Sequence, residues 1–544
     1  MSNHSPEKQS HEGAIDEKGA TPIQDEGVIP QNAKFIEVAN VDYAAALANG
    51  PQLKATSARS LQLFAILLVS FMGSLSNGFD GQVMSAVNGM QQYLTYFNIN
   101  GDDGGVGSVT AIIFGIYSIG SIAGVAVAGP ITDRFGRRGG MALGSLIIII
   151  GAVVITVAKN VHYLLGGRFT LGFGVAITTT AAPAYVVEMS PPQWRGRLTG
   201  LYNTFYYSGS ILCTGLTVAT GRINSTAAWR APLAIQIIPA TILLVFAFLL
   251  PESPRWLISV GRKDEARRIL AKYHGNGDPD APLVLLEWKE FEESVRLDAS
   301  DKRWWDYSEL FHTRNARYRT SMMLLMGFFG QWSGNGLGYF LPILFGAAGA
   351  NTQNQRLTLN FANTIVSATG AVIGTTLTDK VGRRTMWFWG TLASAGTLAV
   401  VTGCTAKWGS TNANPAGANA AIAFIFLFGF VYSLAYTPLQ ALYPAECLDY
   451  NTSYALAVSC ASFVNTYAGP IALQNIQWKY YIVYIVWDLF ECVVIHFFAV
   501  ETKGRTLEEL NEIFEAPNPV KASITKHKVA VVQKSDATEL VIAD

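Results

Sequence analysis

The sequence is poor in charge for its length. Only 14% of its 544 residues are charged, against roughly 25% in an ordinary soluble domain. The 39 Lys and Arg residues equal the 39 Asp and Glu residues, so no basic excess points to a nucleic-acid partner. So few charges cannot cover several water-facing domains, and the composition favours a membrane protein whose outer surface faces lipid.

Cysteine and chemical motifs are scarce as well. The five cysteines are scattered without Cys-x-x-Cys or Cys/His spacing, which supports neither a disulfide framework nor a zinc site. The glycine-rich stretch 166–174 lies inside an apolar run and indicates close helix packing rather than a phosphate loop. We find no metal-ligand cluster and no nucleophile with catalytic partners, so the sequence predicts neither an enzyme nor a cofactor. The polar stretch 1–57 predicts no cleavable signal peptide.

Long apolar runs are abundant, and hydrophobic residues make up 50% of the chain. A helix that crosses a bilayer needs about 20 mostly apolar residues, and about twelve segments meet this length. These segments are 61–83, 107–129, 141–158, 162–186, 198–220, 229–250, 320–347, 358–378, 385–405, 419–443, 453–474 and 479–499. The sequence therefore predicts an all-α membrane protein with twelve membrane-spanning helices.

Lysine and arginine gather in alternate loops between these segments. The short loops 130–140, 187–197 and 379–384 are basic, whereas the loop 100–106 is not. Because basic loops stay in the cytoplasm, we expect both termini to be cytoplasmic. The charged segment 251–318, which divides the spans into six and six, is expected on the same side with short surface helices.

This pattern divides the chain into five regions. A polar N-terminal tail that we expect to be disordered precedes the first six-helix bundle. A cytoplasmic linker joins this bundle to a second one, and a cytoplasmic tail follows, of which 515–544 is also expected to be disordered. The five regions are 1–57, 58–250, 251–318, 319–500 and 501–544.

Charged motifs of the first half recur in the second half. Three pairs match in the same order and at a nearly constant offset: 133–138 (DRFGRR) with 379–384 (DKVGRR), Glu188 with Glu446, and Glu252 with Glu501. Such a repeat indicates two similar six-helix halves. Secondary transporters are built from repeated halves with the substrate site between them.

The charges of these motifs and their neighbours are candidates for a cytoplasmic latch. We expect them to hold helices together when the carrier opens outward, and so to gate a two-state carrier. The alternative is that they only set the topology. The set comprises Asp133, Arg137, Arg138, Glu188, Arg195, Glu252, Arg255, Asp379, Arg383, Arg384, Glu446 and Glu501.

Two ionisable residues lie at similar depth inside predicted spans. Asp80 lies in the first span and Arg168 in the fourth, both toward the outer side. Ionisable groups in lipid are costly and mark functional sites. Two interpretations are open. The pair is either a permanent salt bridge between two helices, or a site where a proton competes with Arg168 for Asp80 and couples proton binding to a conformational change.

Polar side chains also form faces on several predicted spans. The spacing of Asn203, Tyr206 and Tyr207 places them on one face of the fifth span. A cavity lined by such side chains and by aromatic rings suits a sugar, although polar faces can also join helices to one another. The candidate sugar-binding residues are Asn203, Tyr206, Tyr207, Gln331, Asn335, Tyr339, Tyr436, Gln440 and Asn465.

The predicted twelfth span carries two carboxyl groups, Asp488 and Glu491. They are spaced i, i+3 and therefore share one helix face. They form either a second protonatable site or a structural contact with Lys479 or tyrosine hydroxyls, and we favour the structural role.

The motifs resemble those of the sugar porter family of the major facilitator superfamily. The resemblance covers 60–515 and rests on the motifs DRFGRR, GGRFTLGFG, EMSPPQWRGR, PESPRWL, DKVGRR and ETKGRTLEEL. Within this family the chain is most similar to fungal cellodextrin and lactose permeases, through the stretches KYHGNGDP, DKRWWDY, QWSGNGLGYF, AYTPLQALYPAE and GPIAL. The resemblance implies a major facilitator fold and proton-driven uptake of a disaccharide or short β-linked glucan across the plasma membrane.

The resemblance also implies roles for single residues. It implies that Asp80 and Arg168 couple the proton, because proton symporters of this family carry an acid and an arginine at matching places. Asn203 stands where most sugar porters have a binding glutamine. Gln331 matches the second of the family's paired glutamines, but Gly330 replaces the first. We expect the shorter amide and the missing side chain to leave room for a larger sugar.

The sequence thus predicts a proton-coupled symporter that imports cellobiose, a cellodextrin or lactose by alternating access. Its partners are the sugar, protons and membrane lipid, with no nucleic acid. Two alternatives stay open: a proton-independent hexose facilitator, and a sugar sensor that transports little. The sensor is suggested by residues 449–455, which follow Glu446 and lack the basic residue that the resemblance leads us to expect there.

Overall fold

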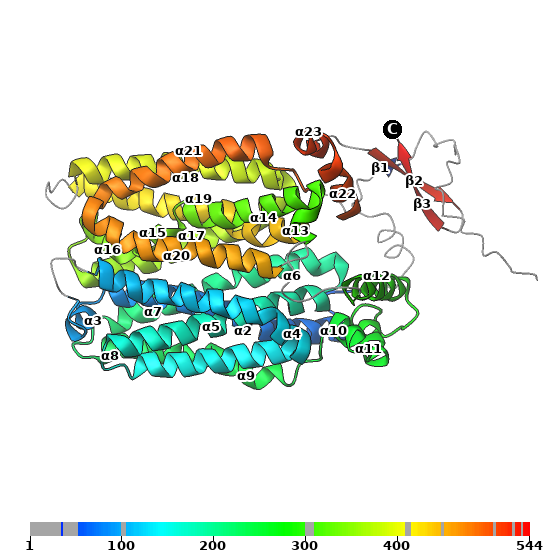
Figure 1. Ribbon diagram of the computed structural model, residues 1–544, viewed down its shortest axis with the longest axis horizontal. Coiled ribbons are helices and arrows are strands. Elements are labelled where there is room, and N and C mark those ends of the chain that lie inside the picture. Colours follow the sequence, from blue (N-terminus) through cyan, green and yellow to red (C-terminus); the bar gives the residue numbers. More distant parts are fainter. Residues whose placement is uncertain are drawn as a thin grey trace, which may run out of the picture. The chain divides into compact units, whose positions relative to one another are not determined.

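The computed structural model (Figure 1) describes residues 34–35, 53–99, 105–299, 309–408, 415–447, 451–503, 507–524, 528–534 and 537–543. The chain divides into two units, a helical one within 38–526 and a small sheet from the two ends of the chain. Most of the tail 1–57 lies outside the described residues, as do 448–450 in the stretch after Glu446.

The first half of the helical unit contains the first six expected spans. Its helices are α2 (Ala58–Asn88), α3 (Gln91–Tyr96), α4 (Ser108–Thr156), α5 (Val161–Met189), α6 (Pro192–Thr204), α7 (Tyr206–Thr220), α8 (Ala227–Ile235) and α9 (Ile237–Ala247). α4 holds two spans in succession, divided at Gly136, whose φ of 80° is a conformation that favours glycine. α6 with α7, and α8 with α9, each make up one span.

The second half repeats this arrangement. Its helices are α14 (Arg314–Trp332), α15 (Asn335–Gly338), α16 (Leu341–Ala347), α17 (Gln353–Val381), α18 (Arg383–Trp408), α19 (Pro415–Cys447), α20 (Asn451–Ile476) and α21 (Tyr480–Phe498), with the short 3₁₀ helix η1 (Gln477–Lys479) before α21. α14, α15 and α16 together form the seventh span, which breaks at Gly334, where φ is 94°.

Side-chain caps explain where several of these helices begin. The Asn160 side chain accepts a hydrogen bond from the Tyr163 amide at 3.2 Å at the start of α5. Thr313 does the same for Ala316 at 3.0 Å before α14, and Thr352 for Gln355 at 3.2 Å before α17. Each cap satisfies an amide that the first turn leaves without a partner.

The expected twelve spans are confirmed. Seven helical stretches in the described part of the chain are long and apolar enough to cross a membrane, and two of them, α4 and the stretch 454–498, each contain two consecutive spans. The three further spans, at 198–220, 320–347 and 385–405, lie in helices that are shorter or more polar. Two of these carry candidate sugar-binding residues, which accounts for their lower apolarity.

Figure 1 shows the helices of each half gathered in one group within the helical unit. α4 packs on α20 and α7 packs on α17 across the two groups. One apolar core surrounds Trp229 in the first half and includes Phe340 and Leu357 of the second half, and another surrounds Trp387 within the second half.

Close helix packing at glycine confirms the expectation for the stretch 166–174. A Cβ atom at Gly172 of α5 would lie 2.2 Å from the Tyr117 carbonyl oxygen of α4, and one at Gly120 would lie 2.2 Å from the Phe169 carbonyl oxygen. The two backbones therefore meet without side chains between them. This crossing holds Tyr117 and Arg168 beside each other.

Short helices lie between the two halves and after them. They are α10 (Pro254–Ser259), α11 (Lys263–Tyr273), α12 (Pro282–Ala299), α13 (Glu309–His312), α22 (Leu507–Glu515) and α23 (Pro519–Ile524). α10 packs against α4 and α5, beside the loop that carries Arg137. We call this end of the helical unit, where the basic loops lie, the basic end, and the other end the opposite end.

The all-α expectation holds for the membrane-spanning helices, and the small sheet unit contains strands from the stretch 515–544, where disorder was expected. β1 (Lys34–Phe35), β2 (Lys528–Lys534) and β3 (Ala537–Ala543) pair antiparallel in the order β1-β2-β3. In the register, Lys34 faces Val531 and Val529 faces Ile542. β-Branched residues are frequent in these strands and favour extended backbone, a local preference that the polar composition of the tails concealed.

Candidate functional site

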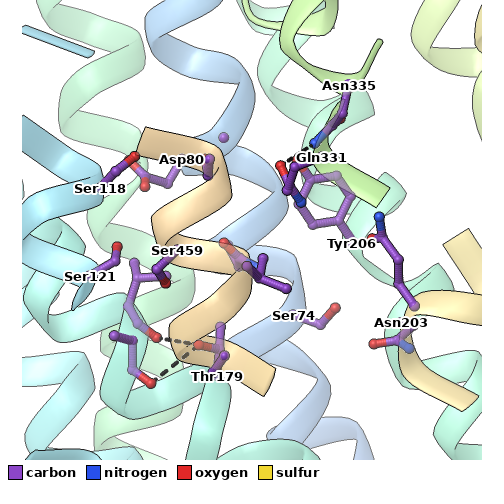
Figure 2. Close-up of a pocket in the computed structure, with 18 of the residues that line it drawn as sticks. Ser74, Asp80, Ser118, Ser121, Thr179, Asn203, Tyr206, Gln331, Asn335 and Ser459 are labelled. Carbon is purple, nitrogen blue, oxygen red and sulfur yellow. Dashed lines mark hydrogen bonds between the residues drawn. The ribbon is translucent and has the colours of Figure 1, made fainter. Parts of the chain in front are cut away.

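A cavity of about 490 Å³ lies between the two halves of the helical unit. The first half contributes residues of α2, α4, α5, α6 and α7, and the second half those of α14, α15, α19 and α20. Figure 2 shows Asp80, Asn203, Tyr206, Gln331 and Asn335 around it. A cavity shared by both halves is where a carrier with repeated halves binds its substrate.

Most of the expected sugar-binding residues line this cavity. They are Asn203, Tyr206, Tyr207, Gln331, Asn335, Tyr339 and Gln440. Tyr436 and Asn465 are buried just behind the lining. The Tyr436 hydroxyl contacts Ser333 at 2.7 Å and Thr391 at 2.6 Å, and the Asn465 amide donates a hydrogen bond to the Gln331 carbonyl oxygen. We therefore place these two residues in support of the lining.

The break in the seventh span positions Gln331 and Asn335. α14 ends at Trp332, and Gly334 takes the left-handed conformation before α15 begins. The Asn335 Nδ2 then donates a 2.8 Å hydrogen bond to Gln331 Oε1, and both side chains line the cavity (Figure 2). The hinge thus presents paired amide groups, which can donate and accept hydrogen bonds with sugar hydroxyls.

Gly330 shapes the same wall of the cavity. A Cβ atom at this position would lie 2.3 Å from Nε2 of Gln440. The Gln440 Nε2 donates a 3.2 Å hydrogen bond to the Tyr432 hydroxyl, which itself donates to the Gly330 carbonyl oxygen. The space that a glutamine would take is therefore filled by Gln440, and the expectation that Gly330 leaves room for a larger sugar is wrong at this point.

Asp80 and Arg168 meet in the cavity wall. The Arg168 Nη1 lies 3.6 Å from Asp80 Oδ1. Arg168 is 5% exposed and Asp80 is 2% exposed. The Arg168 guanidinium also lies over the Tyr117 ring, 4.4 Å from its centre. Both Asp80 oxygens are buried without a hydrogen bond within normal distance in the described part of the chain. At this distance the two charges form an ion pair, although the contact is longer than a normal hydrogen bond.

Several lining residues were not among the candidates. Tyr117, Tyr432, Tyr454, Thr179 and Ser459 all face the cavity. On α19 the lining runs through Thr437, Gln440 and Pro444, which is the helix face one residue beyond Tyr436.

The charged motif of the first half forms one network. Arg137 donates two hydrogen bonds to Glu188, at 3.1 and 3.0 Å, and one to Asp133 at 3.2 Å. Glu252 accepts hydrogen bonds from the backbone amides of Arg137 at 3.1 Å and Ser253 at 2.9 Å. Gly136 makes this possible, because a Cβ atom there would lie 2.3 Å from a Glu252 oxygen. The network joins the kink of α4 at Gly136 to the end of α5 and to the residues just before α10.

The second half repeats the contacts of the arginine with its glutamate and of the backbone amide with the second glutamate. Arg383 donates to Glu446 at 3.3 and 2.7 Å, and Glu501 accepts from the Arg383 backbone amide at 2.8 Å. Gly382 corresponds to Gly136, because a Cβ atom there would lie 2.6 Å from a Glu501 oxygen. Thr502 adds a 2.6 Å hydrogen bond to Glu446. The repeat seen in the sequence thus holds in three dimensions.

The remaining charged candidates are distributed around these networks. Arg138 and Arg384 donate to the carbonyl oxygens of Phe248 and His496, at 2.6 and 2.7 Å. Arg195 pairs with Glu287 of α12 at 2.9 Å. Arg255 lies in α10 beside the first network, and the side chain of Asp379 lies outside the described residues.

Burial affects the acids of both networks at the basic end. It raises the pKa of Glu252 above its ordinary value, against backbone hydrogen bonds that lower it. Burial also raises the pKa of Glu446, although the Arg383 guanidinium opposes this shift. These carboxyl groups therefore take up protons more readily than exposed glutamates.

Hydrogen bonds between the halves gather at the opposite end. Gln353 Nε2 donates to Gln92 Oε1 at 3.0 Å, and Arg222 donates to Asn354 at 3.2 Å. The Ser85 hydroxyl donates to the Gly338 carbonyl oxygen at 3.3 Å. The cavity lining, in contrast, continues toward the basic end. The opposite end is closed in this conformation.

Comparisons with known proteins agree with this architecture. The Candida albicans protein named high-affinity glucose transporter 1 is 28% identical over 499 residues, which cover 87% of this chain and 90% of that protein. The Aspergillus flavus protein named MFS glucose transporter mfs1 is 29% identical over 473 residues, covering 81% and 88%. The solved structure of the proton:xylose symporter XylE bound to 6-bromo-6-deoxy-D-glucose has a TM-score of 0.68 at 22% identity, covering 84% of this chain and 100% of that chain.

A family model described as sugar (and other) transporter matches residues 66–514, so the chain belongs to this transporter family. It is a sugar transporter of the major facilitator superfamily and a multi-pass membrane protein. The expected branch of cellodextrin and lactose permeases stays a prediction, because the relatives above are named glucose transporters.

Proposed function

We propose that this protein is a proton-coupled symporter that imports a β-linked disaccharide or oligosaccharide across the plasma membrane, with both termini in the cytoplasm. The observation that carries the proposal is the buried Asp80–Arg168 ion pair, with its charged atoms 3.6 Å apart, in the wall of a cavity between the halves. With the basic end in the cytoplasm, this conformation faces inward.

The position of the pair supports proton coupling. Asp80 and Arg168 come from α2 and α5, so their distance depends on how these helices pack. A proton on Asp80 removes its attraction to Arg168 and changes the relative free energies of two packings. The networks of Arg137 and Arg383, the proposed latches, each tie the helix ends of one half together at the basic end, and both are formed in this inward-facing conformation as well.

The length of the cavity supports a substrate larger than one sugar ring. Its lining on α19 extends from Tyr432 to Pro444, which is ~18 Å of helix axis at 1.5 Å per residue. Asn203, Gln331, Asn335 and Gln440 supply amides along this length, and Tyr206 and Tyr207 supply rings. Amides and aromatic rings together recognise the hydroxyls and the apolar faces of sugars.

Hexose transport is the second candidate, because the relatives are named glucose transporters. The deciding experiment expresses the chain in yeast that lacks its own sugar carriers. Labelled cellobiose, lactose and glucose are offered while the external pH is recorded. We expect uptake of a disaccharide, alkalinisation of the medium and sensitivity to a protonophore. Glucose uptake that ignores the protonophore would favour the facilitator instead.

A further inference from the structure

Two carboxyl groups are buried in the core of the second half, away from the Asp80 pair. Asp488 and Glu491 of α21 are both 0% exposed. Neither has an ion-pair partner within 4 Å among the described residues. Asp488 has both oxygens buried without a hydrogen bond in the part of the chain that the structure describes. Two ionised carboxylates in such a place are very costly, because neither water nor a cation compensates them.

The groups that face the two acids are neutral. Glu491 accepts hydrogen bonds from the Ser333 hydroxyl at the hinge and from the Tyr436 hydroxyl of α19, the latter at 3.1 Å. α18 contributes Thr391, whose hydroxyl lies 2.6 Å from that of Tyr436. On α21 itself the titratable neighbours are Tyr484 and Cys492. Each of these groups is uncharged near neutral pH, so none of them balances a negative charge.

The hydroxyl hydrogens around Glu491 are fewer than the contacts they must serve. Thr391 donates its hydrogen to the Trp387 carbonyl oxygen at 2.9 Å, and Ser333 and Tyr436 both donate to Glu491. The contacts of Tyr436 with Ser333 at 2.7 Å and with Thr391 at 2.6 Å then have no hydrogen of their own. A proton on Glu491 reduces this shortage, because Glu491 can then donate to Tyr436, whose own hydrogen is released for one of these two contacts.

We propose that Asp488 and Glu491 form a second proton-binding site, which holds at least one proton and fixes the hinge of the seventh span through Ser333. Ser333 lies between Gln331 and Asn335, whose side chains line the cavity. A second route runs from Tyr484 to Asn465 at 3.4 Å and on to the Gln331 carbonyl oxygen. Loss of the proton places a charge beside Ser333 and weakens the geometry of the sugar site. The effect of proton loss on the sugar site rests on the proposed function, because it takes the cavity as the sugar site.

The first test examines the proton alone. Infrared spectra of the purified full chain in lipid nanodiscs report the carbonyl stretch of protonated carboxyl groups. We expect this band at neutral pH in the wild type and in Asp80→Asn, reduced in Glu491→Gln and further reduced in the double variant Asp488→Asn with Glu491→Gln. An unchanged band in the double variant would overturn the proposal, as would loss of the wild-type band on addition of sodium, which would indicate a cation site.

The second test connects the site to the sugar. Trp332 and Trp487 pack 5.2 Å apart beside the hinge, so tryptophan fluorescence can follow sugar binding. Asp80→Asn is the background, since it removes the pH dependence of the first proton site. In this background we expect affinity to fall ~tenfold per pH unit above the pH at which the acids lose one proton. Adding Glu491→Gln, which resembles the protonated acid, should abolish this fall.

The outcomes separate the two ideas. If the sugar affinity of Asp80→Asn does not change with pH while the infrared band is present, the link between the acids and the hinge is overturned. The proton-binding site itself would still stand. Absence of sugar binding in the wild type would count against the proposed function and leave the infrared result standing. Glutamine and asparagine keep the size of the acids, and a melting temperature near that of the wild type shows that a variant is folded.

Discussion

Gly330 shows how one missing side chain sets the lining of the cavity. Gln440 reaches across the place of its Cβ atom and binds Tyr432 at 3.2 Å. We expect Gly330→Ala to displace Gln440 and to raise KM by about 2- to 10-fold, the equivalent of one hydrogen bond. Gly338→Ala, where a Cβ atom meets nothing within 4 Å, is the control. Equal KM values in initial-rate uptake for both variants would show that Gln440 does not contact the sugar.

Glu252 provides a pH-dependent test of the first charged network. Burial raises its pKa above the ordinary 4.5, so the native state binds the proton more tightly than the unfolded chain does. Its contribution to stability is therefore full below the ordinary pKa and is lost as pH rises through the raised value. Glu252→Gln does not titrate. We expect its melting temperature, relative to wild type, to increase as the pH rises above the ordinary value of 4.5 and through the raised pKa of Glu252. A constant difference would contradict the assignment.

Single residues also show what the sequence could and could not predict. Asp80 and Arg168 were predicted to meet because ionisable groups are rare in apolar spans, and they do meet. Tyr436 has the same spacing to Gln440 as a cavity residue would, yet it points to Ser333 and Glu491. Helical spacing defines a shared face to within one residue, and the packing of the neighbouring helices decides which side chain reaches the cavity.

At the scale of helices, the crossing of α4 and α5 depends on glycine. We expect Gly172→Ala to push the backbones apart, because its Cβ atom would lie 2.2 Å from the Tyr117 carbonyl oxygen. Overpacking of this kind costs about 1–3 kcal/mol, and here it also separates Tyr117 from Arg168. Gly166→Ala on the same helix meets nothing within 4 Å and serves as the control. Equal unfolding midpoints for the two variants in detergent would count against this close crossing.

The spans followed from the sequence, because a long apolar run is a local signal. The structure then showed that capping residues such as Asn160 and Thr313 stand at helix starts. The break at Gly334 carried less signal, since a glycine in a span is as often a packing residue as a hinge. Its role depends on Ser333 and Tyr436, which are more than a hundred residues apart in the chain.

At the scale of the whole molecule, the closed opposite end predicts how the carrier must move. Gln92 and Gln353 join the two halves there through a 3.0 Å hydrogen bond. We expect a cross-link between cysteines at these two positions to stop transport, because the substrate enters only when this end opens. Reduction of a disulfide cross-link should restore uptake. Transport that continues in the fully cross-linked protein would contradict alternating access, and each single cysteine variant is the control.

The repeat is the feature of the whole molecule that the sequence predicted best. The matching motifs 133–138 and 379–384 form two equivalent networks in the structure, in which Arg137 binds Glu188 and Arg383 binds Glu446. The size of the cavity and the closed end depend on contacts between the halves, such as Tyr207 with Ser433 at 2.8 Å, and no local pattern carries them. The charged motifs therefore predicted the symmetry of the fold, while the conformation required the structure.

Sugar accumulation in proteoliposomes tests the central claim most directly, namely that Asp80 carries the coupled proton in a cavity between two halves. A proton gradient is imposed, and Asp80→Asn is compared with wild type. We predict that the variant loses accumulation against a gradient but keeps exchange of labelled for unlabelled sugar, because the cavity remains while the titratable group is gone. Accumulation by Asp80→Asn at the wild-type level would contradict the account.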